Sequence, residues 1–476
     1  MKNIRSLLLI VSTLCLSTFQ VLAQDAPPNF VFILADDQGW NALSIPMDPN
    51  NPSSGSTYYR TPRLAKLAKE GMRFSQAYSA GATCSPSRHA IQYSRSPASL
   101  KQFSSNAAAE RKSEDAMANC LKKANENYVC AHFGKWHINP KVDTLGYDIN
   151  DGSNGNRSGN KKDPKDPKNI FDLTKKANGF IETQVKDKKP FFVQISHYAC
   201  HTAYHALEET KKKYETEYSK DANKYHNSPL WAGMNEDMDT GIGMVLDKIE
   251  ELGIRDNTYV IYTADNGYEN KNFSNVPFPE RGFGKAFPIR SAKYTINEGG
   301  VRVPFIVRGP GIPKNTHSAT QVHGTDIFPT ILDMAGGLTQ VPDVAEGGSL
   351  LPLLKSGGKE KVKRKNPFFI FRHSKEKSLH KEIAIIEGQY KMLKEIIPNR
   401  LHLYDLKADL GEQNNLAKEK PELTQTMYEK LSDYLAAHNW DESKIKIVDE
   451  DTKKKGKGKK KSKADKQKNK AEKKKK

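Results

Sequence analysis

Short apolar runs that end at polar or turn-forming residues recur along the chain and predict buried strands. Between them lie stretches in which apolar residues recur at the spacing of one face of a helix. Strands that alternate with helices predict an α/β domain, in which a mostly parallel sheet lies between helical layers. The expected strands are Phe30–Ala35, Phe191–Ser196, Tyr259–Thr263 and Phe305–Arg308, and the expected helices include Pro62–Gly71 and Met238–Gly253.

The pattern changes near Gly336–Asp343, and the remainder predicts a smaller C-terminal α+β subdomain. A stretch earlier in the chain, Asn150–Lys168, is rich in Gly, Asn, Lys and Pro and is expected to be a long surface loop. The length of 476 residues suits a main domain over residues 24–338 and a subdomain over residues 339–448. In the subdomain we expect strands at Phe368–Arg372, Ala384–Glu387 and Tyr390–Glu395, and a helix at Pro421–His438.

The first 23 residues have the pattern of a secretory signal peptide. Lys2 and Arg5 form a basic start, Leu7–Leu16 is mostly apolar, and Val21-Leu22-Ala23 ends in a small residue. The apolar run is too short for a comfortable transmembrane span, and a buried N-terminal helix is the alternative. We therefore expect a secreted or periplasmic protein, and no later segment is predicted to span a membrane.

The net charge of +19 is concentrated at one end of the chain. Residues 453–476 hold 15 lysines against Asp465 and Glu472, a net charge of +13 that leaves +6 for the rest. Because such a segment cannot bury apolar surface, we expect a disordered lysine-rich tail over residues 449–476. The tail could contact acidic glycan or the cell envelope, or have no partner. Nucleic-acid binding is not expected, because no recognised nucleic-acid-binding motif accompanies the tail.

Two of the predicted strands are followed by similar acidic sequences. Phe30–Ala35 runs into Asp36-Asp37, and Tyr259–Thr263 is followed by Asp265-Asn266-Gly267. Ligands bind beyond the carboxyl ends of parallel strands, so three carboxylates and one amide oxygen are expected to meet there. Close carboxylates repel unless a cation neutralises them, and oxygen ligands favour Ca²⁺ or Mg²⁺ over Zn²⁺. We expect Ca²⁺, which tolerates an irregular shell; alternatively, each acidic pair only caps a helix or forms a turn.

A second chemical feature is Cys84-Ser85-Pro86-Ser87-Arg88, which on its own could be an ordinary turn. It matches the Cys-x-Pro-x-Arg signature of the sulfatase family, and further segments match other landmarks of that family in the family's order. The chain resembles a sulfatase from Asn29 to about Ala417. The further matching segments are Asp36-Asp37, Gly134-Lys135-Trp136-His137, His201-Thr202, Asp265-Asn266-Gly267, Lys293 with Glu298–Pro304, Asp326–Thr330, Leu403–Leu406 and Gly411–Leu416.

The resemblance implies an alkaline-phosphatase-like α/β fold and a set of site residues. A formylglycine-generating maturation enzyme would oxidise Cys84 to formylglycine, and Arg88 and Lys135 would hold the hydrated aldehyde and the sulfate. His137 would accept a proton from the second hydroxyl group, and His201 and Lys293 would face the leaving oxygen. The implied Ca²⁺ ligands are Asp36, Asp37, the modified Cys84, Asp265 and Asn266. The implied substrate contacts are Lys135, His201 and Lys293. His373, in a loop of the variable kind that selects the sugar, is a further candidate for substrate binding.

The chain departs from the family pattern at two places. Gln92-Tyr93-Ser94-Arg95 stands where the family usually has Leu-Thr-Gly-Arg. Ala203 replaces the usual proline after His201-Thr202.

Residue types alone leave alternatives open at several of these positions. Lys135 and Lys293 could be surface lysines. His197, His201 and His205, spaced by four, could bind Zn²⁺ from one helix face, although their place after a strand favours a loop. Two cysteines outside the signature could form a disulfide or stay unpaired; they are Cys120 and Cys130.

The function implied by the resemblance is hydrolysis of sulfate esters, with a sulfated polysaccharide or oligosaccharide as the expected substrate. Two alternatives are a phosphonate or phosphodiester hydrolase of the same superfamily, and an inactive protein that binds sulfated glycan. Because core residues overlap within the superfamily, an ester assay distinguishes the first alternative. The chemical state of Cys84 distinguishes the second.

Overall fold

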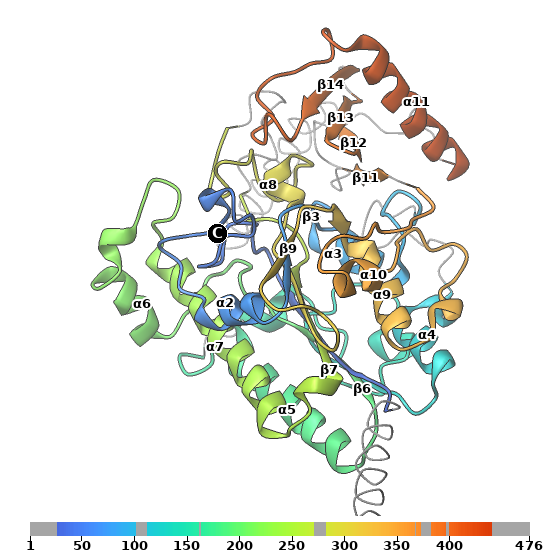
Figure 1. Cartoon of the computed structure of the whole chain (residues 1–476). Helices are drawn as coiled ribbons and strands as arrows, with labels where there is room; N and C mark the ends of the chain where they lie inside the picture. The colour runs from blue at the N-terminus through green and yellow to red at the C-terminus, as the bar shows by residue number, and fades with distance from the viewer. Residues whose placement is uncertain are drawn as a thin grey trace, which may run out of the picture.

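The computed structural model describes residues 26–100, 112–160, 163–270, 282–366, 368–372, 382–396 and 399–439 (Figure 1). The predicted signal peptide, His373 and the lysine-rich tail lie outside the described residues. The main domain is built on an eight-stranded sheet in the order β5-β4-β6-β1-β7-β8-β2-β9. The strands are β1 (Asn29–Ala35), β2 (Met72–Phe74), β4 (Val129–Gly134), β5 (Ile149–Asn150), β6 (Phe191–Ser196), β7 (Thr258–Ala264), β8 (Phe305–Arg308) and β9 (Thr316–Ser318).

The centre of the sheet is parallel, as the strand and helix pattern predicts. β5, β4, β6, β1 and β7 run in the same direction, and β8 is antiparallel to both β7 and β2. In the register of β1, Val31 lies between Val193 of β6 and Val260 of β7. All seven residues of β1 are buried, which explains its almost continuous apolar sequence. The carboxyl ends of the central strands therefore meet at one edge of the sheet.

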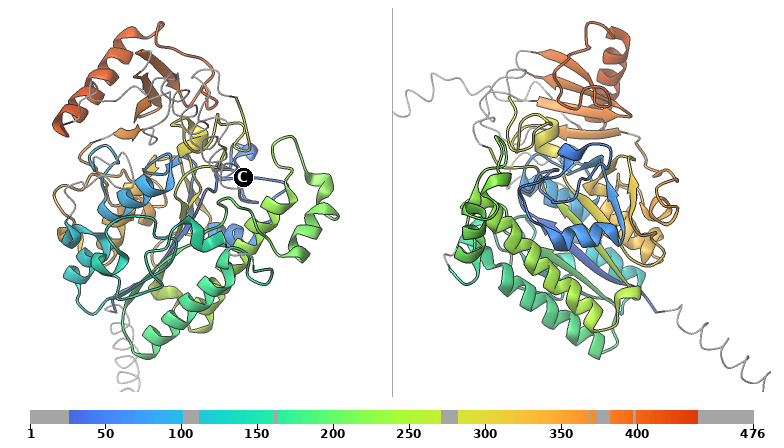
Figure 2. Two further views of the ribbon diagram at one scale, coloured as in Figure 1. Left: turned by 180° about the vertical axis from the view of Figure 1, so that it is seen from behind. Right: turned by 60° about the vertical axis from the view of Figure 1, so that its left-hand side comes forward.

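Helices cover both faces of this sheet (Figure 2). Val31 and Ile33 of β1 pack in one apolar cluster with α2, α5 and α7, whereas Phe30 and Phe32 pack on the opposite face with α3, α4, α9 and α10. Each such buried side chain contributes roughly 1.5–3 kcal/mol to folding. The helices are α2 (Pro62–Lys69), α3 (Cys84–Tyr93), α4 (Met117–Ala124), α5 (Ile170–Lys186), α6 (Glu208–Glu215), α7 (Pro229–Glu251), α9 (Ile327–Met334) and α10 (Leu351–Lys355).

Helix α7 begins well before the predicted start at Met238. Ser228 caps it by accepting a hydrogen bond from the Trp231 amide, and Pro229 occupies its first turn. The periodic signal is weak there because polar side chains face the interior. Asp237 is one of them: its carboxylate accepts hydrogen bonds from the Leu207 amide and the Thr210 hydroxyl group, both at 2.7 Å, at the start of the neighbouring helix α6.

The C-terminal subdomain consists of a four-stranded antiparallel sheet and α11 (Pro421–Ala437), the α+β arrangement that the sequence predicts (Figure 1). Alternate residues of β12 face opposite sides. Ile383 and Ile385 pack against α11, whereas Ala384 and Ile386 pack toward Tyr78 of the main domain. The strands are β11 (Phe368–Arg372), β12 (Glu382–Glu387), β13 (Tyr390–Glu395) and β14 (Arg400–Asp405).

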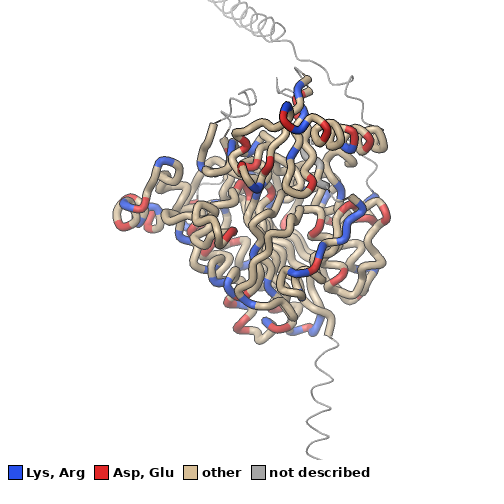
Figure 3. Tube along the Cα trace, turned by 45° about the horizontal axis from the view of Figure 1, so that its top comes forward, with Lys and Arg blue, Asp and Glu red and all other residues tan. Residues whose placement is uncertain are grey.

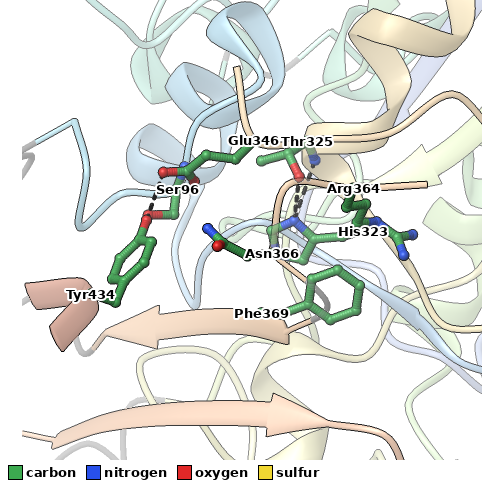
Figure 4. A pocket seen from close by; sticks show the side chains of 8 residues that line it. All are labelled: Ser96, His323, Thr325, Glu346, Arg364, Asn366, Phe369 and Tyr434. Carbon is green, nitrogen blue, oxygen red and sulfur yellow. Dashed lines mark hydrogen bonds between the residues drawn. The ribbon is translucent and has the colours of Figure 1, made fainter. Parts of the chain in front are cut away.

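A small polar cavity of about 20 Å³ lies where the two parts meet (Figure 4). Tyr434 of α11 is hydrogen-bonded to Ser96 Oγ at 2.6 Å and to Glu346 Oε1 at 2.7 Å. A cavity of that size has room for about one water molecule. Its lining joins the subdomain to the main domain through polar contacts.

The stretch Asn150–Lys168 is irregular, as predicted, but the expectation that it is a surface loop is wrong at its end. Lys168 is fully buried. Its ammonium group is 3.2 Å from both Asn160 Oδ1 and the carbonyl oxygen of Ala203. Those oxygens replace water around the buried charge, which is why a lysine can lie there.

Charge on the described surface is mixed in sign. Lysine and arginine are interspersed with aspartate and glutamate along the described trace in the view of Figure 3. Within the described residues, no helix combines the length and the apolar character that a membrane crossing requires.

Candidate active site

The predicted site residues come from six separate segments that meet at the carboxyl edge of the sheet. Asp36 and Asp37 follow β1, and Cys84 begins α3. The other segments follow β4, β6 and β7, or precede the short helix α8 (Glu298–Val301). They carry Lys135 and His137, His201, Asp265 and Asn266, and Lys293 respectively.

Carboxylates and the Cys84 thiol form the centre of the site. One ligand atom from each of Asp36, Asp37, Cys84 and Asp265 lies within 4.8 Å of the others. Cys84 Sγ is 3.2 Å from Asp36 Oδ1 and 3.7 Å from Asp37 Oδ1. All four side chains are buried, so their charges are weakly screened.

Each carboxylate of this centre has a buried cationic partner. Lys135 Nζ lies 2.5 Å from Asp36 Oδ2, and Lys293 Nζ lies 2.8 Å from Asp37 Oδ2. Arg88 lies one helical turn after Cys84 on α3, and its Nε donates to Asp265 Oδ2 at 2.8 Å. The neighbouring η-nitrogen of Arg88 donates to the carbonyl oxygen of Lys135. The alternative that Lys135 and Lys293 are surface lysines is therefore wrong, because each is buried and paired with a carboxylate.

The buried charges shift the pKa values of the carboxyl groups in opposite directions. Burial favours the neutral form of Asp36, but the charges of Lys135, His201 and Arg88 hold its pKa well below the usual range. Burial and the charge of Asp36 raise the pKa of Asp265 to about 6. Asp36 is thus the firmly ionised member of the pair.

Burial lowers the pKa of both histidines of the site. Burial, with the charge of Lys135, lowers the pKa of His137 to about 3. Its Nδ1 is buried and has no hydrogen-bond partner among the described residues. Burial also lowers the pKa of His201, whose Nε2 lies 4.0 Å from Asp37 Oδ2. At pH 7 the imidazole of His137 is therefore neutral and can accept a proton, which is the role that a base near bound substrate requires.

The donor set fits a hard cation. Asn266 Oδ1 is buried and has no hydrogen-bond partner among the described residues, while its Nδ2 donates to Asp37 Oδ1 at 2.7 Å. An unpaired buried amide oxygen is costly unless a ligand satisfies it. Three carboxylates beside that oxygen offer the ligand type that Ca²⁺ and Mg²⁺ prefer.

Sequence reasoning missed Lys168. Its ammonium group holds the carbonyl of Ala203, in the segment that carries His201. Burial lowers the pKa of Lys168 to about 8, against the charge of Asp36. The surrounding Gly, Asn and Pro residues predict a loop, and nothing in the sequence indicates that its last lysine turns inward.

His197, His201 and His205 lie in a loop after β6 rather than on a helix. Of the three, only His201 joins a group of possible metal ligands among the described residues. The remaining alternative is a disulfide, and in the structure Cys120 and Cys130 are free, buried thiols.

The carboxyl edge of a mostly parallel α/β sheet thus carries paired carboxylates and cations, an arrangement suited to binding a metal ion and an anionic group. The sequence model of the family described as Sulfatase matches residues 28–338. A second model, described as N-sulphoglucosamine sulphohydrolase, C-terminal, matches residues 291–438. The chain therefore belongs to the sulfatase family, of the alkaline phosphatase superfamily, and is a sulfuric ester hydrolase.

Similar proteins agree with this assignment. N-acetylgalactosamine-6-sulfatase of Mus musculus is 30% identical over 427 residues, covering 79% of this chain and 74% of that protein. A sulfatase of Formosa agariphila is 25% identical over 529 residues, covering 90% and 93%. The solved structure of Ps i-CgsB in complex with k-i-k-neocarrahexaose has a TM-score of 0.69 at 22% identity, covering 86% of this chain and 93% of that one. That structural likeness shows the fold.

Proposed function

We propose that the protein hydrolyses sulfate esters of a sulfated polysaccharide or its oligosaccharides, using a formylglycine made from Cys84 and a calcium ion. The observation that carries the proposal is the meeting of three carboxylates and three cations around one buried cysteine. A sulfate ester is an anion, so the site that cleaves it has to supply positive charge and hydrogen-bond donors. Arg88, Lys135 and Lys293 supply both.

The encoded Cys84 side chain is a poor nucleophile. Catalytic cysteines act as thiolates, but burial and the charge of Asp265 raise the pKa of the Cys84 thiol. A thiolate there would also face Asp36 and Asp37. Two-electron oxidation by a maturation enzyme, with loss of the sulfur, replaces the thiol by an aldehyde. The hydrate of that aldehyde carries two neutral hydroxyl groups on one carbon.

The metal ligands in this proposal are Asp36, Asp37, Asp265 and Asn266, together with an oxygen of the modified residue 84. When bound, Ca²⁺ would neutralise the carboxylates and lower the pKa of a hydroxyl group next to it. The unpaired Asn266 Oδ1 supports this ligand set. Ca²⁺ is favoured over Mg²⁺ because Ca²⁺ tolerates an irregular set of oxygen ligands.

The two hydroxyl groups of the hydrate have different roles. One releases its proton and attacks sulfur as an alkoxide, the bond from sulfur to the sugar oxygen breaks, and a sulfate ester forms on residue 84. The sugar oxygen takes a proton from His201 or Lys293, which face it. His137, neutral at pH 7, then accepts the proton of the second hydroxyl group. The carbon–oxygen double bond re-forms and expels inorganic sulfate, which regenerates the aldehyde.

The proposed substrate class is supported by the names of similar proteins and by the ligands of similar structures. One relative is named ulvan-active sulfatase and others are N-acetylgalactosamine-6-sulfatases. Solved structures of the same fold contain a neocarrahexaose or D-glucosamine-2-N,6-O-disulfate. The two bound molecules are carbohydrates, and the names of the relatives refer to carbohydrate substrates. A sulfated glycan outside the cytoplasm suits the predicted signal peptide, so we propose a secreted or periplasmic location. His373 and neighbouring residues would help to select the sugar.

Mass spectrometry of the peptide that carries Cys84, combined with ester assays, tests the proposal. Protein from the native host should carry formylglycine at position 84 and turn over aryl sulfate faster than aryl phosphonate or phosphodiester. Cys120→Ser, at a buried thiol of α4 outside the group of possible metal ligands, is the matched control and should keep activity. An unmodified thiol with no turnover indicates a glycan-binding protein, and faster phosphodiester turnover indicates the related hydrolase.

A further inference from the structure

A second buried charge cluster lies between the main domain and the C-terminal subdomain. Its members are Glu298 of α8, Lys391 of β13, Glu412 after β14, and Arg302. The first three are entirely buried, and Arg302 is 4% exposed. Glu298 Oε1 lies 3.1 Å from Lys391 Nζ, which lies 2.8 Å from Glu412 Oε1.

Glu412 binds the backbone at the start of α8. Its Oε2 accepts hydrogen bonds from the Glu298 amide at 2.9 Å and from Asn297 Nδ2 at 3.1 Å. Asn297 is the residue that precedes the helix. The subdomain thus holds α8 by its first amide and by the Glu298 side chain, which also accepts from the Tyr78 hydroxyl group at 3.1 Å.

Helix α8 in turn contacts three segments that carry active-site residues. The Gly300 carbonyl accepts from the Gly267 amide at 3.1 Å, directly after Asn266. The Gly299 amide donates to the Arg290 carbonyl at 2.8 Å, three residues before Lys293. The third contact lies before Cys84, where the Val301 carbonyl accepts from the Ser79 amide at 2.8 Å.

These contacts leave little room for the turn to shift. A Cβ atom on Gly267 would lie 2.0 Å from the Gly299 carbonyl oxygen, and one on Gly299 would lie 2.4 Å from the Ser291 carbonyl oxygen. The backbones therefore touch directly. A displacement of α8 has to move the loop of Asn266 or the loop of Lys293, because no side chain can absorb it.

A cluster of this kind is not needed for stability alone. Taking charges out of water offsets most of their mutual attraction, and well-packed apolar residues would often stabilise as much. The geometry points to Glu412 and Lys391 as positioning residues of the sulfatase reaction: the C-terminal subdomain sets the places of Lys293 and Asn266 by holding α8. This inference rests on the roles of Lys293 and Asn266 in the proposed function.

The test compares Glu412→Gln with Glu395→Gln, using kcat and KM for a small aryl sulfate and thermal unfolding. Glu395 is a matched control, since it is a buried carboxylate of the same sheet and pairs with His402 at 2.9 Å, away from α8. We expect Glu412→Gln to lower kcat by about 10-fold, with KM within about 3-fold, because misplaced groups cost rate more than binding. Glu395→Gln should keep the wild-type kcat.

Lys391→Arg provides a second variant that keeps the charge, and it should retain more of kcat than Lys391→Met. Equal losses of kcat in Glu412→Gln and Glu395→Gln would overturn the inference, as would a wild-type kcat in Glu412→Gln. Lys293→Ala distinguishes a failure of the positioning inference from a failure of the proposed role of Lys293. If Lys293→Ala loses activity while Glu412→Gln keeps it, only the positioning inference fails. If Lys293→Ala is fully active, the proposed role of Lys293 fails with it.

Discussion

The chain buries two charge clusters of similar chemistry, and they differ in whether the carboxylate and amide oxygens all find partners among the described residues. In the cluster around Glu298, the carboxylates of Glu298 and Glu412 reach cations, backbone amides and a tyrosine within the protein itself. In the cluster around Cys84, the carboxylates have cations, but the amide oxygen of Asn266 has no partner among the described residues. In the first cluster the carboxylates are paired within the protein, whereas the second cluster has a donor set that a ligand could complete. The difference separates a structural network from a reactive site.

The largest expected effect comes from Cys84→Ser. Serine keeps one hydroxyl group, so sulfate can be transferred to residue 84, but no second hydroxyl group remains to expel it. In a host that does not oxidise serine at this position, we expect turnover to fall by about 10³-fold or more. Mass spectrometry should show sulfate on residue 84 after a single turnover. Sustained turnover by the unmodified serine variant would eliminate the formylglycine mechanism.

The next effect concerns Asp265, the predicted metal ligand paired with Arg88. Asp265→Asn keeps the size of the side chain but removes a ligand charge. We expect activity to fall by about 10²-fold or more, with loss of bound calcium and retention of the fold by circular dichroism. Normal activity with unchanged calcium content would remove Asp265 from the metal site.

Chelation should distinguish the two clusters by stability. A ligand that binds only the folded state raises the free energy of unfolding, by about 2.7 kcal/mol at 100 times its Kd. Removing Ca²⁺ from wild type should therefore lower Tm by several degrees. Lys391→Met should instead lower Tm both with and without Ca²⁺, because it leaves two buried carboxylates with less charge compensation, at a cost of about 3–5 kcal/mol. Differential scanning calorimetry with and without chelator measures both effects.

The pH dependence of Ca²⁺ binding follows from the pKa of Asp265, raised to about 6 by burial and the charge of Asp36. A protonated carboxyl group is a poor ligand, so metal has to displace its proton below that pH. Ca²⁺ affinity should rise by about tenfold per pH unit up to about pH 6 and then level off. Isothermal titration calorimetry of the metal-free protein checks this. A flat profile between pH 5 and pH 7 contradicts the shift.

The smallest effect is expected from the tail. Deleting residues 453–476 removes 15 lysines but none of the described residues. Turnover of a small aryl sulfate should stay within about twofold, because changes outside the packed core and the buried charge clusters usually have small effects. Elution from an anionic polymer column at lower salt would show loss of electrostatic retention. A large loss of turnover would mean that the tail packs near the active site.

The sequence predicted the strands that carry the site better than the contacts that hold it. The apolar runs of β1, β6, β7 and β8 are strong signals because both faces of those strands are buried. Strand β4, which precedes Lys135, escaped prediction because its sequence, Val-Cys-Ala-His-Phe-Gly, mixes small and polar residues. The site residues could be placed because family motifs fix their order. The hydrogen-bond partners of Lys168 and the ion-pair partners of Lys391 could not be predicted, since such tertiary contacts leave no local pattern in a sequence.

The apolar cluster that links the two parts has a consequence for how the chain unfolds. Tyr78, Ile296 and Val301 of the main domain share one core with Ala384 and Leu393 of the subdomain. Neither part can separate without exposing that core and the ion pairs beside it. The two parts should therefore melt in a single cooperative transition, and a chain cut before β11 should aggregate rather than yield a smaller working enzyme. Exchange of whole subdomains between sulfatases would have to carry both sides of this core together.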